Sequence, residues 1–351
     1  MKIAIDARVI GEKFGIEQYF AKNLVEALMA SKNSDHDITV YVPKNIYNPK
    51  DYSIKIIETD IKPKSVAEQV EFGKILKNEK YDLVHFLSIN HPRSYRQKAL
   101  FTLHSLYKSG QIGQEYLNYH HALDSGYPII ATNILLENRL KRKNNRQLIF
   151  GITLGIDDNL VNNTADLVIN DEFITHLFCG CENGEYDYQY LLTLIEAFAI
   201  LHARNKSLRL TIASTSKLSA IVKLLSENYA RLSSAIVVMQ DCDEIAYFAA
   251  QNEADYCILP WGGSSTLLSA ALAMSSDSLI LAANTLNMRT YLDQCAIYYK
   301  VGDPLDIKDK LEELISQDAV QECLFKEIRK RASTESWGNT ASDLLKFYEK
   351  L

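Results

Sequence analysis

The sequence predicts an α/β protein made of two Rossmann-like halves, with parallel sheets that face each other across a cleft. Short apolar strands without polar alternation are separated by amphipathic helices, which is typical of parallel sheets covered on both faces. This alternation stops in a polar segment, residues 155–172, and then restarts. The length of 351 residues also exceeds what one hydrophobic core commonly serves. We therefore expect one domain over residues 1–155 and a second over 170–336, with a hinge and a ligand cleft between them.

The first half begins with an apolar strand at Lys2–Asp6. Gly11 and Gly15 bracket the following turn, and apolar residues at helical spacing then predict a helix from about Ile16 to Ser31. Further apolar runs predict the other strands of this half, at residues 38–43, 54–59, 83–88, 99–104, 128–133 and 147–152.

The second half repeats the pattern. Its predicted strands occupy residues 175–180, 209–214, 235–240, 256–261, 279–284 and 296–301. Helices centred near Ile195, Leu224, Phe248, Ala271 and Leu311 lie between or after them. The tail, residues 336–351, is an amphipathic closing helix.

Residues 256–284 form the most informative single stretch, because they read as strand, loop, helix and strand. The loop between the first strand and the helix contains Gly262, Gly263, Ser264 and Ser265. Unpaired amides at such a helix start point toward a bound anion, so the turn is a candidate phosphate site. A Gly-Gly pair after a strand is also compatible with an ordinary turn.

Composition narrows the class of protein. With 47% hydrophobic residues, 23% charged residues and a formal net charge of −6, the chain is typical of a soluble globular protein with no general attraction to nucleic acid or anionic lipid. The basic run at 140–146 is interpreted as a solvated helix end. The sequence shows no signal peptide and no membrane span, so we expect a cytoplasmic protein.

All six cysteines lie in the second half, mostly within apolar runs. This favours buried, reduced thiols. Cys179 and Cys181 lack a second Cys or His pair that would complete a zinc site, so no metal is expected.

Several segments, taken in order, resemble the family-four retaining glycosyltransferases of the GT-B fold. The opening strand and glycine loop, residues 1–19, resemble that family's start, and the strand at 99–104 ends in His104 where the family has a functional histidine. Segments that resemble the second half of the family are residues 191–201, 243–261, 296–315 and 336–345. The likeness covers nearly the whole chain.

This resemblance implies that the second domain holds a nucleotide-sugar donor and the first holds a glycan or lipid-linked acceptor. It also implies transfer with retained anomeric configuration, surface polysaccharide synthesis as the setting, and no cofactor or metal. The last helix, from about Trp337, is expected to pack back on the first domain.

The donor-site motif is degenerate. Pro260 and Gly180 match the family pattern, but its two glutamates fall on Ser264 and Leu272. Its arginine and lysine, which hold the diphosphate, fall on Cys181 and Gln189. Each such contact is worth about 1.5–3 kcal/mol, so the loss of two would weaken donor binding by about a hundredfold or more.

The resemblance leaves His104 as the catalytic candidate, in contact with the transferring sugar. The candidates for donor or phosphate binding are Gly15, Ile16, Gly180, Gly262, Gly263, Ser264, Ser265 and Arg289, the last as a substitute cation. A purely structural role for His104 stays open. His85 and His91 have weaker claims, and His120 and His121 are expected on a helix surface.

Two functions follow. One is an active glycosyltransferase with a divergent donor site; the alternative is a non-catalytic relative that binds a partner transferase or a glycan. A Rossmann oxidoreductase is disfavoured, because the first strand leads into GEKFGIEQY and not into a GxGxxG turn.

Overall fold

The computed structural model describes residues 1–31, 36–46, 54–106, 113–144, 146–156, 174–181, 184–260, 264–276 and 278–351, with the backbone alone at 184–187 and 264–265. The chain forms two compact units. The first unit comprises Met1–Gly155 and Trp337–Leu351, and the second comprises Ile156–Ser336. Most of the polar segment at 155–172 lies outside the described residues.

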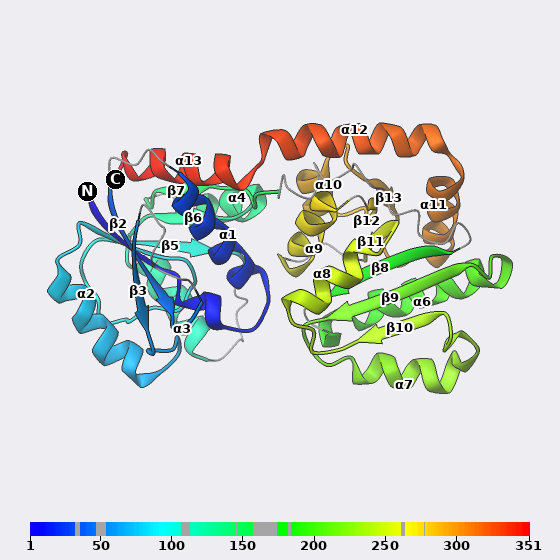
Figure 1. Ribbon diagram of the computed structural model, residues 1–351, viewed down its shortest axis with the longest axis horizontal. Coiled ribbons are helices and arrows are strands. Elements are labelled where there is room, and N and C mark those ends of the chain that lie inside the picture. The colour runs from blue at the N-terminus through cyan, green and yellow to red at the C-terminus, as the bar shows by residue number, and fades with distance from the viewer. Residues whose placement is uncertain are drawn as a thin grey trace. The chain divides into compact units, whose positions relative to one another are not determined.

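The first unit contains a seven-stranded sheet in the order β3-β2-β1-β4-β5-β6-β7 (Figure 1). Its strands are β1 Lys2–Asp6, β2 Asp37–Pro43, β3 Lys55–Thr59, β4 Leu83–Phe86, β5 Ala99–Leu103, β6 Ile129–Ala131 and β7 Ile149–Gly151. Its helices are η1 Arg8–Gly11, α1 Ile16–Ala30, η3 Glu68–Phe72, α2 Gly73–Glu79, α3 Gln114–Asp124, α4 Ile134–Lys143 and α13 Trp337–Tyr348.

The second unit contains a six-stranded sheet in the order β10-β9-β8-β11-β12-β13. Its strands are β8 Thr175–Cys181, β9 Leu208–Ser214, β10 Ile236–Met239, β11 Tyr256–Leu259, β12 Leu279–Ala283 and β13 Ile297–Tyr299. Its helices are α6 Gly184–Arg204, α7 Ser219–Asn228, η4 Ala230–Leu232, α8 Glu244–Asn252, α9 Ser264–Ser275, α10 Leu286–Leu292, α11 Pro304–Ser316 and α12 Asp318–Thr334.

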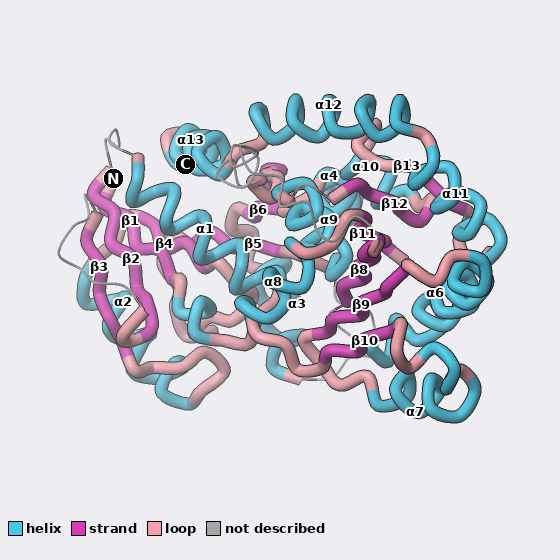
Figure 2. The backbone as a smooth tube through the Cα atoms, turned by 45° about the vertical axis from the view of Figure 1, so that its right-hand side comes forward, coloured by secondary structure: helices cyan, strands magenta, loops and turns pink. Residues whose placement is uncertain are grey.

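Every pairing between these strands is parallel. The central strands are buried on both faces, as in β5 and β12, where all residues are buried. Helices therefore cover both faces of each sheet, and Figure 2 shows the strands enclosed by helices in either unit. The predicted α/β class with two parallel sheets is confirmed.

Helix α13 belongs to the first unit although it ends the chain, and Figure 1 shows it beside α1. The Tyr348 hydroxyl lies 2.7 Å from Nδ1 of His85 on β4, and Phe347 stacks on Phe150 of β7 at 4.5 Å between ring centroids. The indole of Trp337 contacts Tyr19 and Phe20 of α1 edge-on. The apolar face of the tail is thus buried against α1 and the sheet.

In each sheet, the direction in which the chain adds successive strands reverses once. In the first unit the chain moves from β1 out to β3 and then returns to β4 beside β1; in the second it moves from β8 out to β10 and returns to β11 beside β8. Because right-handed crossovers of opposite direction lie on opposite faces, a crevice opens outside the carboxyl ends of the two strands at the reversal. Ligands of such folds bind there, so β1/β4 and β8/β11 mark the places to examine.

Within the described part of the chain, no helix is both long enough and apolar enough to cross a membrane.

Candidate active site

His104 follows β5 directly and is buried, with 3% of its surface exposed. Its Nε2 donates to the Leu87 carbonyl, at 3.5 Å, and its Nδ1 lies 3.2 Å from the Thr132 hydroxyl. The ring packs edge-on against Phe20 of α1. Burial lowers the pKa of His104 to about 4, with the Leu87 bond opposing it, so the imidazole is neutral at pH 7. The side chain has structural partners of its own, and its predicted contact with a sugar stays a prediction.

A second histidine network lies beyond β4, next to the reversal point. Nη1 of Arg96 donates to Nε2 of His121 at 3.0 Å, and Nδ1 of His121 lies 2.9 Å from Nε2 of His91. Nδ1 of His91 in turn lies 2.9 Å from the Ile89 carbonyl. Arg96 can only donate. With both imidazole rings neutral, Nδ1 of His121 therefore donates to Nε2 of His91, and Nδ1 of His91 donates to the Ile89 carbonyl. Burial lowers the pKa of His91 to about 4, and His121, expected on a helix surface, is half-buried.

Gly15 and Ile16 mark the start of α1, after the loop that follows β1. A Cβ at Gly15 would meet only the Lys13 carbonyl oxygen, at 4.0 Å, and its φ of 171° is ordinary extended backbone. Packing therefore does not require glycine here. The Ile16 side chain is buried in the core, and donor binding at Gly15 and Ile16 stays a prediction.

Charged side chains from three crossover segments meet near this loop. Lys64, after β3, forms a 2.6 Å ion pair with Glu115 in the first turn of α3. Glu17 in the first turn of α1 lies half-buried nearby. Its pKa is raised to about 7, first by burial and then by the negative charge of Glu115. A carboxyl group of this kind accepts a proton near neutral pH.

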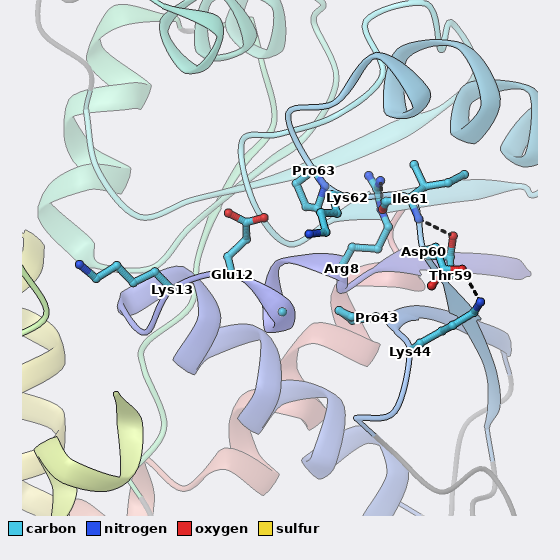
Figure 3. Close-up of a pocket in the computed structure, with 11 residues that line it drawn as sticks. Arg8, Glu12, Lys13, Pro43, Lys44, Thr59, Asp60, Ile61, Lys62 and Pro63 are labelled. Atoms are coloured by element: carbon cyan, nitrogen blue, oxygen red, sulfur yellow. Dashed lines mark hydrogen bonds and ion pairs between the residues drawn. The ribbon is translucent and has the colours of Figure 1, made fainter. Parts of the chain in front are cut away.

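Sequence reasoning also missed a cavity of about 380 Å³ at the carboxyl ends of β1, β2 and β3 (Figure 3). Its charged lining residues are Arg8, Glu12, Lys13, Lys44, Asp60 and Lys62. Lys44 and Asp60 form an exposed ion pair. The available signal was a charged residue at or directly after the end of each strand, namely Asp6, Lys44 and Asp60, but the adjacency of these strand ends depends on strand order.

A buried ion triad contributes Arg8 to the lining of this cavity. The Arg8 guanidinium donates to both carboxylate oxygens of Asp6, at 2.8 Å each, and to Glu68 at 2.7 Å. It also donates to the Ile61 carbonyl at 3.0 Å and lies over the Phe72 ring. Burial alone would lower the pKa of Arg8, but the two carboxylates raise it; burial raises the pKa of Glu68 in spite of Arg8. The triad holds the loop after β3 in place.

In the second unit, Gly180 sits near the end of β8 at the reversal point. A Cβ built there would lie 1.7 Å from the Tyr247 hydroxyl oxygen and 2.9 Å from Oγ of Ser269. These two hydroxyls are buried and 2.7 Å apart. Close packing alone therefore demands glycine, and phosphate binding at Gly180 stays a prediction.

Strand β11 pairs with β8 at the same reversal point, and the predicted phosphate turn follows it in the sequence. Gly262 and Gly263 lie outside the described residues, and α9 begins at Ser264, so Ser265 is in its first turn. Cys181 and Leu272 of α9 occupy positions where the resembled family has charged residues. Their side chains are buried, with 4% and 5% of their surface exposed. Gln189 on α6 is exposed. The apolar character of Cys181 and Leu272 is thus built into the core of this unit.

Arg289 lies on α10, one strand further along the sheet edge. Its Nε donates to Oδ1 of Asn284 at 2.8 Å, and its guanidinium stacks 3.9 Å from the centroid of the Tyr298 ring. It lines a cavity of about 470 Å³ that also contains Lys330 and Glu327 of α12. Among the described residues, no group of three or more His, Cys, Asp or Glu side chains is arranged to hold a metal ion.

Solved structures of the same architecture match the whole chain. Sucrose-phosphate synthase from Thermosynechococcus elongatus shares 16% identity at a TM-score of 0.69, covering 100% of this chain and 98% of that one. A glycosyltransferase from Rickettsia africae shares 14% identity at 0.69, over 99% and 98% of the two chains. HepE from Anabaena, in complex with UDP and glucose, shares 12% identity at 0.71 over 100% of both. The fold is therefore GT-B.

Neither the protein-family models nor the curated proteins contain a match to this chain.

Proposed function

We propose that this protein is a glycosyltransferase that moves a sugar from a nucleotide-sugar to a glycan or lipid-linked acceptor with retention of configuration. The observation that carries the proposal is the end-to-end structural match to a protein named as a glycosyltransferase and to HepE, whose solved complex contains UDP and glucose. The match covers both units. A match to one Rossmann-like unit alone would say less, because that unit occurs in proteins of many unrelated functions.

The donor belongs in the second unit, at the β8/β11 reversal point. There the start of α9, a twelve-residue helix, offers backbone amides to a diphosphate, which supports a role for Ser264 and Ser265 together with Gly262 and Gly263. Arg289, exposed on α10, is the cation that supports the diphosphate from the neighbouring strand end. Gly180 keeps the end of β8 close to Tyr247.

The acceptor and the reacting sugar belong at the carboxyl edge of the first unit. His104 is neutral and buried there, and the Gly15–Ile16 turn opens α1 beside it. A neutral imidazole stabilises a sugar hydroxyl without adding charge. We extend the proposal to surface polysaccharide synthesis in the cytoplasm, without a cofactor or metal.

A non-catalytic relative that binds a partner transferase or glycan is the second candidate. The observation in its favour is the burial of Cys181 and Leu272, which occupy places of charged donor ligands in the resembled family.

Thermal unfolding of the full chain with a panel of nucleoside diphosphates and their sugars tests the proposal. A ligand present at a hundred times its Kd should add about 2.7 kcal/mol to the free energy of unfolding of the second unit. Arg289→Ala should weaken the affinity about tenfold, as expected for one charge-assisted contact, so the same ligand concentration should then add only about 1.4 kcal/mol. Lys223→Ala, an exposed control on α7 of the same unit, should leave it unchanged. Absence of stabilisation by every nucleotide tested would contradict donor binding.

A further inference from the structure

The cavity at the ends of β1, β2 and β3 is separate from the place of His104. Strand order puts β1 and β4 between β2 and β5. Three strand spacings of about 4.8 Å each separate the middle of the cavity from the end of β5, about 14 Å in total. A single sugar ring cannot bridge that distance, so a molecule bound at both places has to be extended.

The charges around the cavity are balanced. Lys44 is matched by Asp60, and the Arg8 guanidinium is matched by Asp6 and Glu68 beneath it. Glu12, Lys13 and Lys62 also line the cavity, and Figure 3 shows the Lys13 side chain extending away from the other labelled residues. This arrangement provides hydrogen-bond donors and acceptors side by side without a strong field of either sign, which suits hydroxyl groups better than an anion or a cation.

The walls are preorganised. Arg8 bonds the Ile61 carbonyl, and Glu68 accepts from the Lys64 amide at 3.0 Å, so the loop after β3 is fixed at both ends. Pro43 and Pro63 add rigid apolar surface to the lining. The volume of about 380 Å³ falls within the range of small-molecule sites.

We propose that this cavity binds a neutral sugar unit of the acceptor, remote from the hydroxyl that reacts. The acceptor is then an oligosaccharide that runs along the carboxyl edge of the first sheet from β3 toward β5. The identification of the bound saccharide as an acceptor rests on the proposed function. The binding of a neutral saccharide to the cavity is measured independently of that function.

Methyl NMR of the isoleucine-labelled full chain provides the test, because Ile61 lines the cavity and Ile129 on β6 does not. The probes are maltose, cellobiose, lactose and chitobiose as neutral disaccharides, with glucuronic acid and glucose 6-phosphate as anionic ones. We expect at least one neutral disaccharide to shift the Ile61 methyl signal, with an affinity that does not fall as salt is raised.

Asp60→Ala should weaken that binding about tenfold, because a carboxylate bonded to sugar hydroxyls is lost. Asp343→Ala, which breaks a comparably exposed ion pair on α13, should change nothing. Both variants should fold, since exposed ion pairs contribute little to stability.

The proposal is overturned if no neutral disaccharide shifts Ile61, or if only the anionic probes do so in a salt-sensitive manner. Nucleotide-sugar binding by the same sample, read from thermal unfolding, separates this failure from failure of the proposed function. Donor binding without saccharide binding rejects the cavity assignment alone, and saccharide binding without donor binding rejects the transferase.

Discussion

Replacement of Arg8 by methionine should lower the free energy of unfolding of the first unit by about 3–5 kcal/mol. Arg8 and Glu68 are at most 1% exposed, and Asp6 is 6% exposed. Methionine fills much of the same space, but it leaves two buried carboxylates without their cation. Differential scanning calorimetry of the full chain measures the loss as a downward shift of the transition assigned to this unit.

The control for this variant removes one of the two buried carboxylates that Arg8→Met leaves unpaired. Arg8→Met combined with Glu68→Gln should recover part of the loss, because only Asp6 then stays buried and unpaired. Lys346→Met, which breaks an exposed pair on α13, should cost less than 1 kcal/mol. A cost below 1 kcal/mol for Arg8→Met itself would mean that the triad does not form as described.

Gly180→Ala should destabilise the second unit by about 3 kcal/mol, because the new methyl group would overlap the Tyr247 hydroxyl. Tyr247 is 1% exposed and its ring also packs on Phe178, so the hydroxyl has little room to withdraw. Chemical denaturation of the wild type and the variant measures the difference.

Tyr247→Phe provides the matched background. In that background Gly180→Ala should cost clearly less, since the atom 1.7 Å from the new methyl group is gone, although the ring carbon at 2.7 Å still prevents full recovery. Gly15→Ala, where packing leaves room for a methyl group, should leave stability nearly unchanged. Equal costs of Gly180→Ala in both backgrounds would rule out the Tyr247 contact as the cause.

The strands could be predicted from the sequence because parallel strands buried on both faces are continuous apolar runs. Each of the thirteen predicted strands has a counterpart among β1–β13, and nine of these are one to three residues shorter than predicted. Helix α12 gave a weaker signal, because it buries only Leu324, Ile328 and Ala332 and presents charged residues elsewhere. Helix α10 is short, at seven residues.

The sites were less accessible to prediction because their meaning depends on partners far along the chain. The need for glycine at position 180 comes from Tyr247 and Ser269, and the burial of His104 comes from Phe20 and Thr132. The cavity at β1–β3 requires the ends of three strands to be neighbours, which only the strand order reveals.

Turnover of the nucleotide-sugar is the most direct measurement of the proposed activity. Phosphorus NMR of the full chain, incubated with the donor that stabilises it most and with the disaccharide that binds it best, follows the release of nucleoside diphosphate. A glycosyltransferase predicts steady release that depends on the disaccharide and falls at least tenfold in His104→Gln. A donor that binds but stays intact in the presence of that disaccharide would contradict catalysis and favour the non-catalytic relative.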